Sequence, residues 1–146
     1  MKSELSESGL QRFIDAQDRV YDAVCAELAR GRKTTHWMWF IFPQLQGLGR
    51  SVMARHFGIA SRAEALAYWQ HPVLRMRLVH CTQLLLTHPN LNAHAIFGSP
   101  DELKLRSCLT LFGQVAPEDP VFVQALERFF HGQPDDATLV LLQQLD

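Results

Sequence analysis

Apolar residues recur at steps of three and four along most of the chain, which is the spacing of one face of a helix. The pattern is clearest over residues 9–30, where charged side chains fall mainly between the apolar positions. The apolar stripe there consists of Leu10, Phe13, Ile14, Val20, Tyr21, Val24 and Leu28. Gly31 follows directly and is typical of the residue that ends a helix. The pattern therefore predicts a long amphipathic helix with one buried face.

Start and stop signals mark the remaining helices. Ser51 can cap a short helix, and Ser61 with Glu64 three residues later forms a capping box. The run Ser99-Pro100-Asp101-Glu102 combines an N-cap serine, a first-turn proline and two first-turn acids, so it predicts a helix capped by Ser99. These further helices are predicted over residues 51–56, from 61 to the residues before Pro72, and over 72–88, 99–113, 120–131 and 138–145.

Patterns typical of strands are nearly absent, no segment repeats at a fixed period, and no linker is long enough to divide the chain. We therefore expect an all-α fold. Residues 1–146 should form one compact multihelical domain of about six to eight helices, with a core over about residues 9–145.

Composition narrows the class of protein. A chain of 146 residues that is 47% hydrophobic and 20% charged can bury a core without disulfides or structural metals. The 14 Lys plus Arg are balanced by 15 Asp plus Glu, which argues against a general nucleic-acid binder or a membrane-surface polycation. The first residues lack an apolar signal core, and no stretch approaches the roughly 18 apolar residues of a membrane span. We expect a cytoplasmic protein.

Neither cysteine nor histidine follows the spacing of a metal site. Cys25, Cys81 and Cys108 are widely spaced in apolar-periodic segments, so we expect reduced thiols in the core. The seven His are scattered without the spacing of metal ligands. The sequence thus predicts no metal site and no cofactor.

Residues 32–51 form the first candidate site, because they combine aromatic, amide and cationic side chains in one segment. Trp37 and Trp39 offer indole faces for stacking a planar ligand. Gln44 offers an amide, and Arg50 offers a guanidinium for a carboxylate or phosphate. The glycine turn before the next helix adds backbone N–H groups that can bind an anion. The same residues also fit a simpler interpretation, in which the aromatic side chains fill the core and the glycines form an ordinary turn.

The second candidate site lies on the helix that follows Ser99. Asp101, Lys104 and Ser107 are spaced by three residues, so one face presents an acid, an amine and a hydroxyl in a row. Such a row can serve an active site, although an acid next to a lysine is also typical of a surface ion pair. No Ser-His-acid or Ser-x-x-Lys context marks Ser107 as a nucleophile.

Blocks along the whole chain resemble the domain of unknown function 1810 family of bacterial proteins, which has no established activity. The resemblance extends from about Gly9 to Leu142, and its blocks include Leu10–Gln17, His36–Gln44, Gly47–Ser51, His71–Leu74, Phe97–Asp101 and Lys104–Phe112. It implies a compact all-helical fold and a set of family-typical polar residues. These are Asp15, Gln17, Arg32, Lys33, His36, Trp37, Trp39, Gln44, Arg50, Ser51, Asp101, Lys104, Ser107 and Thr110.

Two further labels bear on this resemblance. Some members of the family are called calpastatin, but that class is largely disordered and this chain has a globular composition. The carboxy-terminal order of a lysine, an aromatic residue, Leu126, Gly132 and Leu141-Leu142 is similar to the NADAR superfamily, helical proteins associated with ADP-ribose derivatives and N-glycosidic bond cleavage. The glutamate–histidine pair of that superfamily has no matching position here, so the similarity does not imply its catalysis.

We hypothesise that the two segments form a pocket for a small anionic, phosphorylated or nucleotide-like ligand. The expected ligand-binding residues are Trp37, Trp39, Gln44, Arg50, Ser51, Lys104 and Ser107. If the protein is an enzyme, which the sequence leaves open, His36 or Asp101 would be the catalytic residue that handles a proton.

The alternative hypothesis is a non-enzymatic interaction module or homo-oligomer. Phe129, Phe130 and the apolar positions of residues 139–145 are the candidate contact face. RNA binding through Arg30, Arg32 and Lys33 is a third hypothesis, which the balanced charge disfavours.

Overall fold

The structure is a computed structural model that describes residues 2–145. Within this range the chain forms nine α-helices and no strand, so the all-α expectation is confirmed. The helices are α1 (Lys2–Arg30), α2 (Met38–Ile41), α3 (Val52–Phe57), α4 (Arg62–Gln70), α5 (Pro72–Leu86), α6 (Ala93–Phe97), α7 (Asp101–Val115), α8 (Val121–Phe130) and α9 (Asp136–Gln144).

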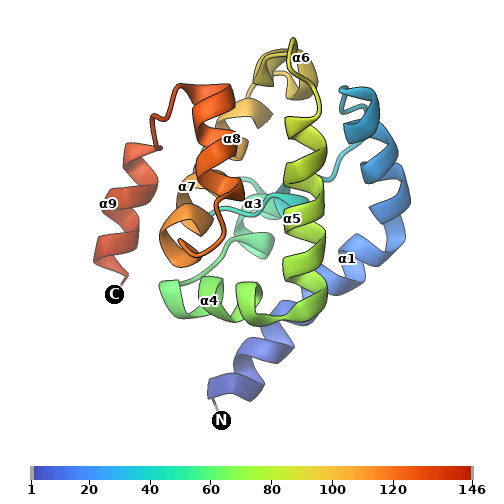
Figure 1. Ribbon diagram of the computed structural model, residues 1–146. Helices are drawn as coiled ribbons and strands as arrows, with labels where there is room; N and C mark the ends of the chain where they lie inside the picture. Colours follow the sequence, from blue (N-terminus) through green and yellow to red (C-terminus); the bar gives the residue numbers. More distant parts are fainter. Residues whose placement is uncertain (1, 146) are drawn as a thin grey trace.

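Helix α5 lies between α1 on one side and α7, α8 and α9 on the other (Figure 1). It contacts α1, α4 and α8, while α7 contacts α4, α6, α8 and α9. Apolar side chains from all these helices form one buried cluster. No helix in the described part of the chain is long and apolar enough to cross a membrane.

Most of the expected helix boundaries are present with the expected chemistry. The Ser51 hydroxyl accepts a hydrogen bond from the Ala54 amide, and the Ser61 hydroxyl accepts one from the Glu64 amide. Gly31 adopts a left-handed conformation with φ of +79° directly after α1, as expected for a C-terminal stop.

Two short helices were not expected from the periodicity. Helix α2 consists of four apolar residues, so it shows no alternation between apolar and polar faces. Helix α6 has five residues and begins after Asn92, whose side chain accepts a hydrogen bond from the Ala95 amide. These two helices raise the number in the described residues above the expected six to eight.

The expected cap of α7 is wrong. Pro100 precedes the helix and makes no side-chain cap bond, and the Ser99 hydroxyl instead donates to the Glu102 carboxylate at 3.1 Å. The Glu102 amide is satisfied by the Gly98 carbonyl at 3.0 Å. The last helix also begins earlier than expected, at Asp136, because Asp135 caps it by accepting from the Thr138 amide.

The segment after α2 is held in place by backbone pairing. The Gln46 amide donates to the Ile59 carbonyl at 2.8 Å, and the Ile59 amide donates to the Gln44 carbonyl at 2.9 Å. This short parallel bridge fixes Gln44 between α2 and α3, and so positions one wall of the site described next.

Candidate functional site

A buried carboxylate fixes the start of the aromatic segment. Glu27 of α1 is only 3% exposed and accepts hydrogen bonds from the Thr34 amide at 2.6 Å and from the Thr35 amide at 2.9 Å. It also accepts from the Thr35 hydroxyl at 2.6 Å and from the Trp37 indole nitrogen at 3.0 Å. These bonds attach the turn before α2 to α1 and hold Trp37 in the core.

The same contacts set the protonation of Glu27. Burial by itself raises the pKa of a carboxyl group, but the hydrogen bonds from Thr35, Thr34 and Trp37 outweigh it and lower the Glu27 pKa to about 2. The group is therefore an ionised acceptor at neutral pH.

An ion cluster joins the two candidate segments. Asp101, in the first turn of α7, accepts from Lys33 at 2.9 Å and from Lys104 at 3.3 Å, one lysine on each carboxylate oxygen. The side chains of Lys33, Asp101 and Lys104 are 8%, 20% and 23% exposed. Two cations therefore share one anion, and the cluster keeps a net positive charge at its partly buried position.

Both lysines also lie against indole rings. The Lys33 ammonium is 5.1 Å from the Trp37 ring centroid, and the Lys104 ammonium is 5.3 Å from the Trp39 ring centroid. The cluster thus places Lys104 beside Trp39, at the border between α2 and α7.

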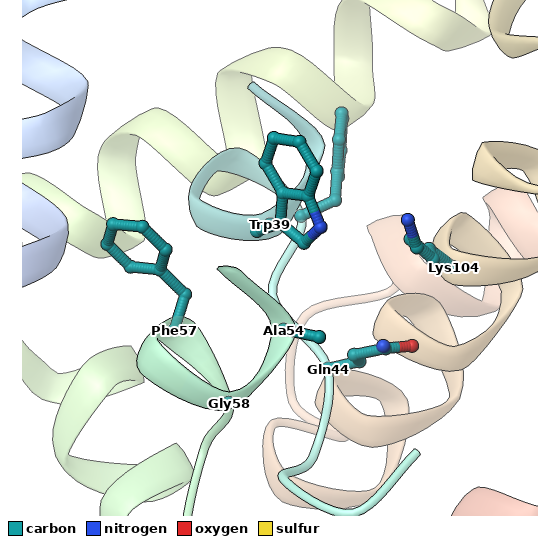
Figure 2. Close-up of a pocket in the computed structure, with 7 residues that line it drawn as sticks. Trp39, Gln44, Ala54, Phe57, Gly58 and Lys104 are labelled. Carbon is teal, nitrogen blue, oxygen red and sulfur yellow. The ribbon is translucent and has the colours of Figure 1, made fainter. Parts of the chain in front are cut away.

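A small cavity opens at this border (Figure 2). It is lined by Trp39, Phe42, Gln44, Ala54, Phe57, Gly58 and Lys104 and has a volume of about 10 Å³. The Trp39 indole nitrogen is buried and has no hydrogen-bond partner among the described residues. Figure 2 shows that nitrogen turned toward Lys104, with the Gln44 side chain reaching below them toward α7. A buried donor without a partner is rare in folded proteins, so it marks this cavity as a place for an acceptor atom.

A larger groove continues from the cavity, because Gln44 and Lys104 line both. It has a volume of about 280 Å³ and lies between the segment that follows α2, the start of α7 and the start of α9. Its lining residues are Gln44, Leu48, Gly49, Pro100, Leu103, Lys104, Ser107, Asp135 and Ala137.

Asp135 lines the groove at the start of α9, next to Ser107. One of its oxygens, Oδ2, accepts from the Ser107 hydroxyl at 3.1 Å, the Thr138 amide at 3.1 Å and the Thr138 hydroxyl at 2.5 Å. The Asp135 amide donates to the Thr110 hydroxyl at 2.9 Å. Arg106 donates to the carbonyls of Gln133 and Pro134, so the start of α9 is fixed to α7 by several bonds.

Comparisons with known proteins agree with this fold. Residues 7–142 match the family described as a protein of unknown function (DUF1810). The chain belongs to this family. A solved structure, that of the conserved hypothetical protein Rv1873 from Mycobacterium tuberculosis, is similar with a TM-score of 0.90 and 46% identity over 92% of this chain and 96% of that chain.

The comparisons give no activity. No curated protein matches the chain. The match to DUF1810 and the similarity to Rv1873 give no support to a relationship with the NADAR superfamily.

The tertiary structure of this DUF1810 protein brings five of the expected site residues together. Trp39, Gln44 and Lys104 line the small cavity, Ser107 lines the groove, and Asp101 holds Lys104 from outside the groove. Both expected segments therefore contribute to one hollow.

Four expected site residues lie elsewhere. Trp37 is 0% exposed and packs in the core, so no ligand can stack on it in this structure. Ser51 is the N-cap of α3. His36 and Arg50 are exposed, and neither lines the cavity or the groove.

The expected list omitted three residues that shape the site: Glu27, Lys33 and Asp135. A signal existed for Asp135, because an aspartate three residues before Thr138 is typical of an N-cap. Glu27 gave no local signal, since its partners are set by the turn after α1. Lys33 was among the family-typical polar residues, but its pairing with the distant Asp101 could not be read from local spacing. No group of three or more metal-ligating side chains is found in the described part of the chain.

Proposed function

We propose that this protein binds a small anionic molecule in the groove between α7 and the segment that follows α2. The observation that carries the proposal is the position of Lys104. Lys104 lines both hollows, beside a buried indole N–H that has no acceptor among residues 2–145. An anion there would receive hydrogen bonds from both groups.

The size and lining of the groove favour a small ligand over a nucleotide. A volume of about 280 Å³ is near the lower end of ligand pockets. Trp37 is buried, and Lys104 lies over one face of the Trp39 ring, so neither Trp37 nor that face of Trp39 is free to stack on a nucleobase. The structure therefore supports the expectation of an anionic ligand better than the expectation of a nucleotide-like ligand.

The arrangement supports binding more than catalysis. Both oxygens of Asp101 are paired with lysine ammonium groups, so this carboxylate holds the lysines in position. His36 lines neither hollow, so no group with an assigned proton-transfer role lies in the groove.

A thermal-shift panel of acetate, butanoate, inorganic phosphate, sugar phosphates, AMP and ADP-ribose tests the proposal. A bound ligand at a hundredfold excess over its dissociation constant should stabilise the fold by about 2.7 kcal/mol, which for a chain of this size raises Tm by about 5–10 °C. Lys104→Gln should weaken binding of the best anion about tenfold. Arg50→Gln removes an exposed cation outside the groove and serves as the matched control.

The proposal is contradicted if no member of the panel stabilises the wild-type protein. It is also contradicted if Arg50→Gln weakens binding as much as Lys104→Gln does, because the binding would then depend on overall charge.

The interaction-module alternative has weaker support. Phe129 and Phe130 are half-buried, and guanidinium groups lie over both rings, Arg128 at 4.6 Å and Arg106 at 5.9 Å from the centroids. These cations cover the Phe129 and Phe130 part of the expected face, whereas Val140 of α9 remains exposed.

A further inference from the structure

The two ends of the groove differ in chemistry. At the α2 end, the Trp39 indole and the Lys104 ammonium can only donate hydrogen bonds, and Gln44 adds an amide with no partner in the described part of the chain. The cavity at this end, of about 10 Å³, has room for one water-sized atom. A single oxygen of an acid fits there and would satisfy the Trp39 donor.

The far end of the groove offers an acceptor. Asp135 binds the Ser107 and Thr138 donors with Oδ2, while its Oδ1 receives no hydrogen bond from any described residue. An ionised carboxylate accepts and cannot donate, so this oxygen suits an ammonium or hydroxyl group of a ligand.

The distance between the ends limits the length of the ligand. Lys104 and Ser107, which line the two ends, are three residues apart on α7, so they are separated by about 4.5 Å along the helix axis. The rest of the groove lining is largely apolar, with Leu48, Pro100, Leu103 and Ala137 among its residues. A chain of a few methylene groups suits this apolar lining.

We infer that the ligand is a short aliphatic acid with an ammonium or hydroxyl group at its other end. Its carboxylate lies at Trp39, Lys104 and Gln44, and its donor group lies at Asp135. This inference rests on the proposed function, since it names the chemical class of the anion bound in the same groove.

Three matched probes test the inference: butanoate, 4-hydroxybutanoate and 4-aminobutanoate, each titrated into the full chain by calorimetry. The wild-type protein should bind 4-aminobutanoate about tenfold more tightly than butanoate, with 4-hydroxybutanoate between them, because the hydrogen bond to Asp135 is charge-assisted.

Two variants test the contributions of the two ends of the groove separately. Asp135→Asn keeps an N-cap side chain on α9 and should remove the preference for 4-aminobutanoate, so that it and butanoate bind with similar affinity. Trp39→Phe keeps an aromatic ring but loses the indole N–H, so it should weaken all three probes by a similar factor and leave the preference intact. Thermal melting of both variants verifies that they fold.

The outcomes distinguish this inference from the proposed function. If butanoate binds as tightly as 4-aminobutanoate, or if the preference survives in Asp135→Asn, the inference is overturned while anion binding stands. The same holds if none of the three acids binds but phosphate or AMP does. If no anion of either panel binds, both the inference and the proposed function are overturned.

Discussion

At the scale of single residues, Glu27 gathers four hydrogen bonds on one buried carboxylate. The pKa of Glu27 is lowered to about 2 in the folded protein, against about 4.3 in an unfolded chain. The ionised carboxylate therefore stabilises the fold fully at pH values above about 4.3. That contribution, about 3 kcal/mol, is lost as the pH falls from about 4.3 through about 2.

We therefore expect Glu27→Gln to lower the free energy of unfolding by about 2–3 kcal/mol at pH 7, since an amide N–H₂ would face some of the present donors. Urea denaturation of both proteins at pH 7 and near pH 2 measures this. The difference should shrink near pH 2, where the wild-type carboxyl begins to be protonated in the folded protein and its ionisation contributes little stability. A difference in unfolding free energy that is equal at both pH values would contradict a stabilising role for the ionised Glu27 carboxylate.

We expect Cys25 to be the most reactive of the three thiols. A hydrogen bond from Cys81 lowers the Cys25 pKa to about 6, and Tyr21 and His80 act in the same direction. Cys25 is half-buried, whereas Cys81 and Cys108 are buried. The sequence predicted that all three thiols lie in the core. The packing of α1 against α5 makes Cys25 different from the other two in burial and pKa.

Alkylation by iodoacetamide should therefore modify Cys25 first, with a rate that rises between pH 5 and 7 and then levels off, because the thiolate forms above about pH 6. Mass spectrometry after timed quenching follows the reaction, and Cys25→Ser is the control. A rate that still rises through about pH 8.5, the pKa of an ordinary thiol, would argue against the lowered pKa.

At the scale of helices, Gly31 and Gly113 form a matched pair. Gly31 has a positive φ of +79°, and a Cβ there would lie 2.5 Å from Leu91 Cδ1. Gly113 is inside α7, where a Cβ would have 3.9 Å to its nearest neighbour, Phe122.

Gly31→Ala should destabilise the fold by about 1–2 kcal/mol, whereas Gly113→Ala should stabilise it by about 0.5–1 kcal/mol through helix propensity. Thermal unfolding of both variants measures whether Tm falls for Gly31→Ala and rises for Gly113→Ala, relative to the wild-type protein. Equal effects at the two positions would show that the C-terminus of α1 does not require glycine.

Helices with both a periodic face and a terminal signal were predictable from the sequence. The Ser61 cap and the Gly31 stop act locally, and the structure has both. Helix α2 was not predictable in this way, because a run of four apolar residues has no alternation between apolar and polar positions. The Ser99 cap is absent because the N-cap position falls on Pro100, one residue later, and the Gly98 carbonyl already accepts the Glu102 N–H.

At the scale of the whole molecule, the large apolar side chains that remain most exposed are distributed over different helices. They are Val52 on α3, Met76 on α5, Leu103 on α7, Val123 on α8 and Val140 on α9. Single exposed apolar residues are ordinary on a monomer surface.

We therefore expect a monomer of 16.7 kDa by light scattering over a series of dilutions. A mass near twice this value at the higher concentrations would favour the homo-oligomer alternative, and Arg106→Ala, which uncovers Phe130, would then be expected to strengthen it.

The sequence by itself determined the helical class, most helix boundaries and the two segments that contribute to the groove. These features depend on local spacing: the apolar period, the caps and the stops. Only the tertiary structure decided which side chains face the groove, because that depends on contacts between residues far apart in the chain. Trp37 and Trp39 are two residues apart, yet the Trp37 indole N–H donates to Glu27 in the core, while the Trp39 N–H, beside Lys104, has no partner in the part of the chain that the structure describes.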